Sequence, residues 1–180
     1  MRETARTGTP RPESTRPAPR APRSRVAVRP ASLDDLDAVV ALRIALLREH
    51  AHNPVYGRLR SDAPERARRL FAAQLESAYE VTLLAERAAT PVGILRCVDA
   101  AGSPLLHPAH YAYVASVYVV PAERRAGVLR ALMAEAEAWS RDRGLREMRL
   151  HNAADNPLAG AAWQALGFDV VEVLRVRSLD

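Results

Sequence analysis

The sequence contains no lysine and only one cysteine, Cys97. A single cysteine cannot form a disulfide within the chain, and it excludes a metal site built from paired cysteines. A Walker A loop needs a lysine and a dinucleotide fingerprint needs a G-x-G-x-x-G run, and the chain has neither. These absences exclude common metal-binding and nucleotide-binding motifs, so no metal is expected. The sparse cysteine usage fits a reducing cytoplasm, which is the expected location.

Long apolar runs are also missing. No stretch approaches the roughly 18 to 20 apolar residues that cross a bilayer, and the N-terminal segment lacks the apolar core of a secretory signal. Neither a membrane span nor a membrane partner is therefore expected.

The net charge of +5 is unevenly distributed along the 180 residues. Residues 1–25 hold seven arginines and two glutamates, which leaves residues 26–180 neutral. Because the first segment is rich in Pro, Arg, Ser and Thr, it cannot bury enough apolar surface to offset the entropy of ordering. The sequence predicts a disordered Arg- and Pro-rich tail over residues 1–25 and one folded domain over residues 26–180.

A functional role for this tail is the less favoured interpretation. It would make the segment an arginine-rich arm for RNA or an acidic partner, or an organelle transit peptide. Because the folded part carries no excess of positive charge, a nucleic acid is not the expected partner.

From Val26 onward, the spacing of apolar residues predicts the order β–α–α–β–β–β–α–β–α–β. The first half comprises a strand at 26–30, a helix from Ser32 to near His50, a helix from about 62 with Leu70, Phe71 and Leu75 on one face, and hairpin strands at 81–86 and 92–98. The second half comprises a strand at 111–120, a helix after Gly127, a strand at 145–152, a short helix capped by Asn156, and one or two final strands within 168–179.

One joint in this order carries an unusual set of residues. The stretch VYVVPAERRAGVLRALM, residues 117–133, passes from a strand through arginines and Gly127 into an amphipathic helix. The first turn of a helix has free backbone N–H groups and a positive dipole end, so such a joint can bind a phosphate. The alternative is a turn with solvated arginines. A second distinctive stretch is NPLAGAAWQALGF, residues 156–168.

The element order and these two stretches together resemble the Gcn5-related N-acetyltransferase (GNAT) family. The first stretch is similar to the family's V-x-P strand end and its [QR]-x-x-G-x-[GA] pyrophosphate loop, and the second to its N-x-x-A-x-x-x-Y-x-x-x-G-F segment. The resemblance, which covers roughly residues 26–180, implies an α/β (α+β) fold. Its single central sheet is mixed and mostly antiparallel, with splayed fourth and fifth strands and helices on both faces.

The resemblance also implies a function. It predicts an acetyltransferase that moves an acetyl group from acetyl-coenzyme A to a primary amine by direct transfer. The expected partners are acetyl-coenzyme A, an amine acceptor and, as an option, a second copy of the chain in a homodimer. The implied coenzyme contacts come from the strand end, the loop, the first helical turn and the later helix: Val117, Tyr118, Val119, Arg124, Arg125, Ala126, Gly127, Val128, Leu129, Arg130, Asn156 and Trp163.

Two residues depart from the family pattern. Leu129 stands where the loop usually has Gly or Ala, which predicts crowding near the phosphates. Trp163 stands where the family usually has a tyrosine that is thought to protonate the leaving thiolate. An indole N–H has no accessible acidity, so Trp163 cannot perform that transfer. Alternatively, Trp163 is an aromatic residue of the core with no role in catalysis.

The implied chemistry needs a hydrogen-bond donor that stabilises the oxyanion, and a route by which the amine loses its proton. The resemblance assigns the donor to the backbone N–H of Val119 and aligns Tyr113 with the position where some relatives carry a Glu or His base. A tyrosine is a poor base unless its pKa is shifted. The identity of the base therefore stays open: a water molecule relayed through Tyr113 and a histidine, either His110 or His50, are the alternatives.

The acceptor itself is not specified by the sequence. The loop after the first helix, which includes His50 and Tyr56, and the fourth strand at Tyr111 supply the candidate acceptor contacts. A small metabolite, an antibiotic, a peptide N-terminus and a lysine all stay open. Two other functions also remain: a non-catalytic acyl-coenzyme A sensor of the same fold, and an adaptor that uses the basic tail.

Overall fold

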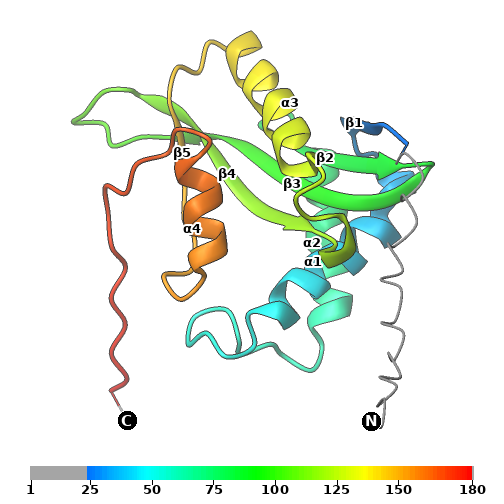
Figure 1. The fold of residues 1–180 in the computed structure, drawn as a ribbon. Coiled ribbons are helices and arrows are strands. Elements are labelled where there is room, and N and C mark those ends of the chain that lie inside the picture. Colours follow the sequence, from blue (N-terminus) through cyan, green and yellow to red (C-terminus); the bar gives the residue numbers. More distant parts are fainter. Residues whose placement is uncertain (1–23, 180) are drawn as a thin grey trace, which may run out of the picture.

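The computed structural model describes residues 24–179 as a three-layer arrangement around one twisted sheet (Figure 1). The predicted tail falls almost wholly on residues 1–23, outside the described residues. The strands are β1 (Val26–Pro30), β2 (Glu80–Arg87), β3 (Thr90–Ala101), β4 (His110–Val119) and β5 (Met148–Leu150). They lie in the order β1-β2-β3-β4-β5, antiparallel except for the parallel pair β4 and β5. The predicted mixed sheet is confirmed.

Within residues 24–179, four α-helices cover the two faces of this sheet: α1 (Leu36–Glu49), α2 (Ala63–Leu75), α3 (Val128–Asp142) and α4 (Pro157–Gln164). Two short 3-10 turns, η1 (Leu33–Asp35) and η2 (Pro121–Glu123), precede α1 and α3. One buried cluster lies between the sheet and α1 with α2, and a larger one lies between the sheet and α3 with α4. No helix among residues 24–179 is long and apolar enough to span a membrane.

The helix ends follow from local sequence. Ser32 and Asp35 form a reciprocal capping box before α1, as their spacing predicts. Asn156 Oδ1 accepts a hydrogen bond from the Ala159 N–H at 3.0 Å, and Pro157 occupies the first position of α4. Gly144, after the end of α3, has a left-handed backbone with φ of 73°.

A β-bulge in β4 changes which face of the sheet its side chains meet. Ala112 and Val114 face the α3 side, and so do Val117 and Val119, although the interval between Val114 and Val117 is odd. The extra residue is accommodated at Ser116, which has φ of 62°, where the pairing of β3 with β4 also shifts. Tyr118 is thereby turned toward α1 on the opposite face.

Three details of the predicted elements are wrong. Residues 168–179 form no strand, and most of their large apolar side chains are exposed. The fifth strand covers only Met148–Leu150 because β4 and β5 diverge beyond Val114. Leu70 is 55% exposed, and the buried face of α2 is instead made by Ala67 and Phe71.

Candidate functional site

The loop from Arg124 to Gly127 is shaped to present backbone N–H groups. Arg125 and Gly127 both have left-handed backbones, with φ of 59° and 82°, and such turns create concave sets of N–H groups that bind anions. The first intrahelical bond of α3 is donated by Ala131 to the Gly127 carbonyl. The earlier N–H groups of the helix therefore have no partner within it, and its first turn contains no acidic side chain.

The space and charge around this loop suit an anion. A Cβ atom added to Gly127 would have no atom within 4 Å, so the volume beside the loop is open. Arg125 and Arg130 are exposed, and neither has a carboxylate partner among the described residues. Val128 is buried and Leu129 packs against the core beneath α3, so the side chain expected to crowd the phosphates also contributes to the core.

Arg124 is held in a different environment from the other loop arginines. Its Nε donates to the Val119 carbonyl at 3.0 Å, and its Nη2 donates to Glu49 Oε2 at 2.6 Å. Its guanidinium also lies over the Tyr118 ring, 5.8 Å from the centroid. The hydrogen bond to Glu49 raises the pKa of Arg124. Arg124 thus joins the loop to the end of α1 and to the edge of β4.

The backbone of Val119 faces the open edge of the sheet. Val120 donates its N–H to the Val92 carbonyl on the side of β3. Because successive residues of a strand direct their N–H groups to opposite edges, the Val119 N–H points away from β3. On that side β5 pairs only with residues 112–114 of β4. A donor at Val119 is therefore accessible from the gap between the diverging strands.

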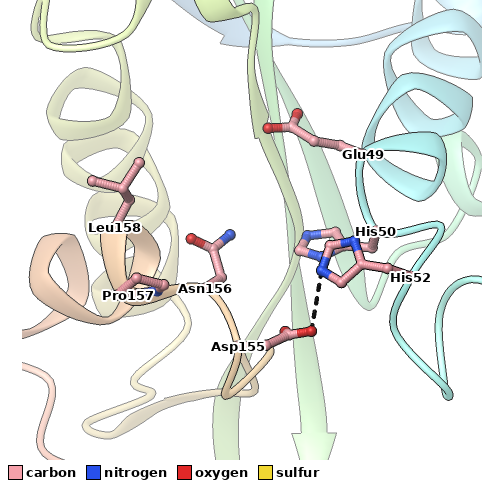
Figure 2. Close-up of a pocket in the computed structure, with 7 residues that line it drawn as sticks. All are labelled: Glu49, His50, His52, Asp155, Asn156, Pro157 and Leu158. Carbon is pink, nitrogen blue, oxygen red and sulfur yellow. Dashed lines mark ion pairs between the residues drawn. The ribbon is translucent and has the colours of Figure 1, made fainter.

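A cleft of about 220 Å³ lies between the end of α1 and the start of α4 (Figure 2). Seven residues line it: Glu49, His50, His52, Asp155, Asn156, Pro157 and Leu158. The two groups are about a hundred positions apart in the chain, and they meet because α1 and α4 cover opposite faces beside the splayed strands. Asn156 reaches the cleft because it caps α4.

The walls of the cleft carry negative charge and imidazole rings. Asp155 lies 3.1 Å from His52 Nε2, the contact drawn in Figure 2, and accepts a longer hydrogen bond of 3.4 Å from the Asn53 side chain. His50 packs against Tyr56 with ring centroids 5.9 Å apart. The side chains of Asp155 and Glu49 remain about 40% exposed, so a cationic ligand can reach both.

Tyr113 is joined to a histidine that sequence reasoning missed. The Tyr113 hydroxyl and His151 Nδ1 are 2.8 Å apart, and the two rings lie 5.6 Å apart. Burial raises the pKa of Tyr113, and the neighbouring Tyr56 and Tyr111 hydroxyls add to the shift. His151 comes directly after β5, and the parallel register of β5 beside β4, which only the folded sheet supplies, brings it next to Tyr113.

Three other predicted residues lie in different surroundings. His110 pairs with Asp99 at 2.7 Å at the opposite end of β4 from Val119, roughly 30 Å along the strand. Tyr111 lies beneath the Arg149 guanidinium, 4.0 Å from the ring centroid. Trp163 is only 8% exposed and packs edge-to-face on Phe168, within the core on the α3 side. His110 is therefore remote from the cleft, and Trp163 is a core residue.

No group of three or more His, Cys, Asp or Glu side chains within residues 24–179 is arranged to hold a metal ion. The open features are instead an N–H-rich loop, an unpaired strand edge and an acidic cleft.

Comparison with known proteins gives matches of two kinds. A curated aminoglycoside N(6')-acetyltransferase type 1 from Acinetobacter genomosp. 13 is 38% identical over 61 residues, which are 34% of this chain and 42% of the relative. An aminoglycoside N(6')-acetyltransferase type 1 from Stenotrophomonas maltophilia is 42% identical over 55 residues, or 31% of this chain and 36% of that protein. The chain thus matches less than half the length of these curated relatives.

The fold has close structural counterparts. A predicted acetyltransferase from Clostridium acetobutylicum, solved with acetyl-CoA, superposes with a TM-score of 0.70 at 17% identity over 85% of this chain and 96% of that one. The family model for the acetyltransferase (GNAT) family matches residues 45–168, which include the loop, the open strand edge and the α4 segment. The chain therefore belongs to the acetyltransferase (GNAT) family.

Proposed function

We propose that this protein transfers an acetyl group from acetyl-coenzyme A to the primary amine of a small molecule. The observation that carries the proposal is the position of Arg124, which bonds to the Val119 carbonyl and to Glu49 of the cleft. It joins the N–H-rich loop, the open edge of β4 and the acidic cleft into one continuous surface. Such a surface can bind an anionic coenzyme and a cationic acceptor side by side.

The loop residues fit the pyrophosphate of coenzyme A. The first N–H groups of α3 have no partner within the helix, the space beside Gly127 is open, and the helix dipole of α3 favours negative charge there. Arg125 and Arg130 add charge-assisted hydrogen bonds. In this proposal the pantetheine arm of the coenzyme lies along the open edge of β4 beside Val117, Tyr118 and Val119. Asn156 lies across the gap from them.

Acetyl-coenzyme A supplies the acetyl group as an activated thioester. In the proposed reaction the acceptor nitrogen forms a bond to the acetyl carbon, the carbon–sulfur bond breaks, and the sulfur leaves as a thiolate. The Val119 N–H stabilises the negative charge that develops on the carbonyl oxygen. Free thiols have a pKa near 8.5, so the thiolate can leave without an acid at the position of Trp163.

Tyr113 and His151 provide the route for the amine proton. Because burial raises the pKa of Tyr113, the phenol stays protonated and cannot act as a phenolate base at neutral pH. We infer that Tyr113 donates its proton to His151 Nδ1 while it accepts one that a chain of water molecules carries from the acceptor amine, since Tyr113 lies about 20 Å along β4 from Val119. Imidazole is the side chain suited to accept a proton near neutral pH.

The cleft favours an acceptor that is small and cationic. Asp155 attracts an ammonium group, Glu49 adds negative charge that its ion pair with Arg124 offsets in part, and a volume of about 220 Å³ holds an amino-sugar ring more readily than a folded protein. The curated relatives carry the name aminoglycoside N(6')-acetyltransferase. Aminoglycosides and other amino sugars are therefore the acceptor class that we propose, with His50 and Tyr56 forming part of the wall.

Thiol release tests this function directly. The protein is mixed with acetyl-coenzyme A and a panel of amines: aminoglycosides, polyamines, amino acids and a lysine peptide. We expect free coenzyme A to appear fastest with an aminoglycoside and one acetyl group to be added to that acceptor, as measured by mass spectrometry. Binding of acetyl-coenzyme A without thiol release from any amine would favour the acyl-coenzyme A sensor, and preference for the lysine peptide would contradict the acceptor class.

A further inference from the structure

One arginine between the sheet and its helices has no counter-ion. Arg43 belongs to α1, which lies with α2 over one face of the sheet (Figure 1), and its guanidinium is 5.3 Å from the centroid of the Phe71 ring. Its Nε atom is buried without a hydrogen-bond partner, and no carboxylate pairs with the group among residues 24–179. A buried charge without a partner is costly, so its presence in a folded protein indicates a partner that binds from outside.

A second arginine increases the positive charge at this place. Leu95 and Cys97 face α3, so Arg96, which lies between them on β3, faces the α1 and α2 side of the sheet. Its Nε donates to Glu80 Oε2. Burial and the nearby charge of Arg96 lower the pKa of Arg43 to about 10, which leaves Arg43 charged at neutral pH. Two guanidinium groups thus share one carboxylate, and one positive charge has no counter-ion.

The sheet beside this pair is open to a ligand. Arg96 lies opposite Ala115 in the register of β3 with β4. Ala115 is small and partly exposed, and it faces the same side as Tyr113 because Val114, between them, faces α3. Its position is within about 13 Å of Val119 along β4. A small ligand over Ala115 therefore lies between the positive pair and the proposed site of acetyl transfer.

We propose that Arg43, supported by Arg96, binds a carboxylate of the acceptor, so that the acceptor is an acidic amino sugar. The inference rests on the proposed acetyl transfer to an amino sugar and narrows the acceptor to one that carries both charges. Its ammonium group meets the negative charge of Asp155 in the cleft, and its carboxylate meets the guanidinium of Arg43. Arginine suits this role because its planar fork donates two parallel hydrogen bonds to a carboxylate.

The alternative is that Arg43 is retained for packing alone, because its side chain covers the Phe71 ring. In that case an apolar residue of similar length would leave the choice of acceptor unchanged. Replacing a buried charge by an apolar residue is often neutral or stabilising, so thermal stability alone does not separate the two roles. Acceptor preference separates them.

The parent protein provides the first test. Thiol release is compared for glucosamine and glucosaminuronic acid, in which a carboxylate replaces the primary alcohol. We expect kcat/KM to be at least about tenfold higher for the acid, because a hydrogen bond to a charged group contributes roughly that factor or more. Equal values for the two sugars would overturn the proposal. A higher value for glucosamine 6-phosphate than for the acid would overturn the assignment of a carboxylate.

Arg43→Met provides the second test, and Arg48→Met is the matched control on the exposed side of the same helix. Melting temperatures show that each variant is folded. We expect Arg43→Met to lower kcat/KM for glucosaminuronic acid by about 10- to 100-fold and to remove the preference for the acid. Arg43→Lys should restore part of that preference, since it keeps the charge but not the paired N–H groups. Arg48→Met should keep the preference of the parent. A folded Arg43→Met protein that keeps it would overturn the proposal.

Glucuronic acid separates this inference from the proposed function, because it has the carboxylate but no amine to acetylate. In a ligand-observed NMR titration it should bind to the parent and at least about tenfold more weakly to Arg43→Met. If no amine released thiol, acetyl transfer would be contradicted, while this difference in binding would still support the carboxylate site. Thiol release from glucosamine without any binding of glucuronic acid would overturn the carboxylate site alone.

Discussion

The loop before α3 is formed by four consecutive residues, Arg124 to Gly127, whereas the cleft beside α4 combines residues from two segments about a hundred positions apart. The loop has its shape because Gly127 and Arg125 adopt left-handed backbones and because the next residue begins a helix. The cleft exists only because α1, the diverging strands and α4 are held by the sheet. The proposed coenzyme side is thus local and the proposed acceptor side is distributed.

The difference predicts how each side responds to change. A local site loses its function when the conformation of its own backbone changes. Single substitutions in the loop should therefore abolish coenzyme binding without unfolding the protein. A distributed site depends on several side chains that each contribute modestly, so substitutions there should alter rate or acceptor affinity in part. Arg124 is the exception, because it belongs to the loop and bonds to Glu49 in the cleft.

The largest effect is expected for Gly127→Glu. The new side chain places a carboxylate in the open volume beside the loop, where it repels and blocks the pyrophosphate, and a non-glycine residue with this φ costs about 1–2 kcal/mol. We expect acetyl-coenzyme A affinity to fall by at least about 100-fold, as measured by calorimetry.

Gly144→Glu is the matched control for this change. Gly144 has φ of 73° and equally open surroundings, but it lies at the other end of α3. Both variants should lose similar thermal stability, while only the loop variant loses coenzyme binding. Equal coenzyme affinities in the two variants would remove the loop from the site.

The next largest effect is expected for the Tyr113 and His151 pair. Tyr113→Phe and His151→Gln each remove one end of the proton route, and general acid–base catalysis is typically worth about 10²- to 10⁴-fold. We expect kcat to fall by about 10²-fold in either variant, with the double variant no worse than the singles because the two act as one unit.

The pH profile separates this role from a structural one. Because burial raises the pKa of Tyr113, the phenol stays protonated across the neutral range, so Tyr113→Phe should lower kcat/KM by the same factor at each pH there. His110→Gln is the control, since His110 pairs with Asp99 at the far end of β4, and an unchanged rate in the His151 variant would rule out the relay.

A smaller effect is expected for Asp155→Asn, which removes one negative charge from the cleft but keeps the shape of the side chain. The acceptor KM should rise by about tenfold, whereas the KM for acetyl-coenzyme A should stay within about twofold, as steady-state kinetics with each substrate would show. Glu137→Gln, which alters an exposed ion pair on α3, should change neither value. An equal rise in both KM values would mean that Asp155 stabilises the site rather than the acceptor.

The smallest effect on turnover is expected for Trp163→Phe. Trp163 packs against Phe168 in the core, so the loss of ring volume should lower the free energy of unfolding by about 1–2 kcal/mol. We expect kcat to stay within about twofold in single-turnover measurements. Trp163→Tyr is the companion variant, and a tenfold gain in turnover there would mean that the site lacks an acid which a phenol restores.

Local patterns predicted much of this molecule. The helix start at Ser32, the Asn156 cap and the joint at Gly127 depend on neighbouring residues, and each was recognisable in the sequence. The wrong details involve packing between distant segments. Leu70 has the helical spacing of a core residue, but the packing of α2 on the sheet buries Ala67 and Phe71 instead.

The order of elements and the phosphate-type loop could be inferred from the chain alone, because hydrogen bonds within a few residues and the periodicity of apolar side chains define them. The pairing of Tyr113 with His151, the meeting of Glu49 with Arg124 and the exposure of residues 169–179 could not. The first depends on the parallel register of β5 beside β4, and the second on the docking of α1 beside the loop before α3. Such contacts arise from the register of strands and the docking of helices, and no short run of sequence encodes either one.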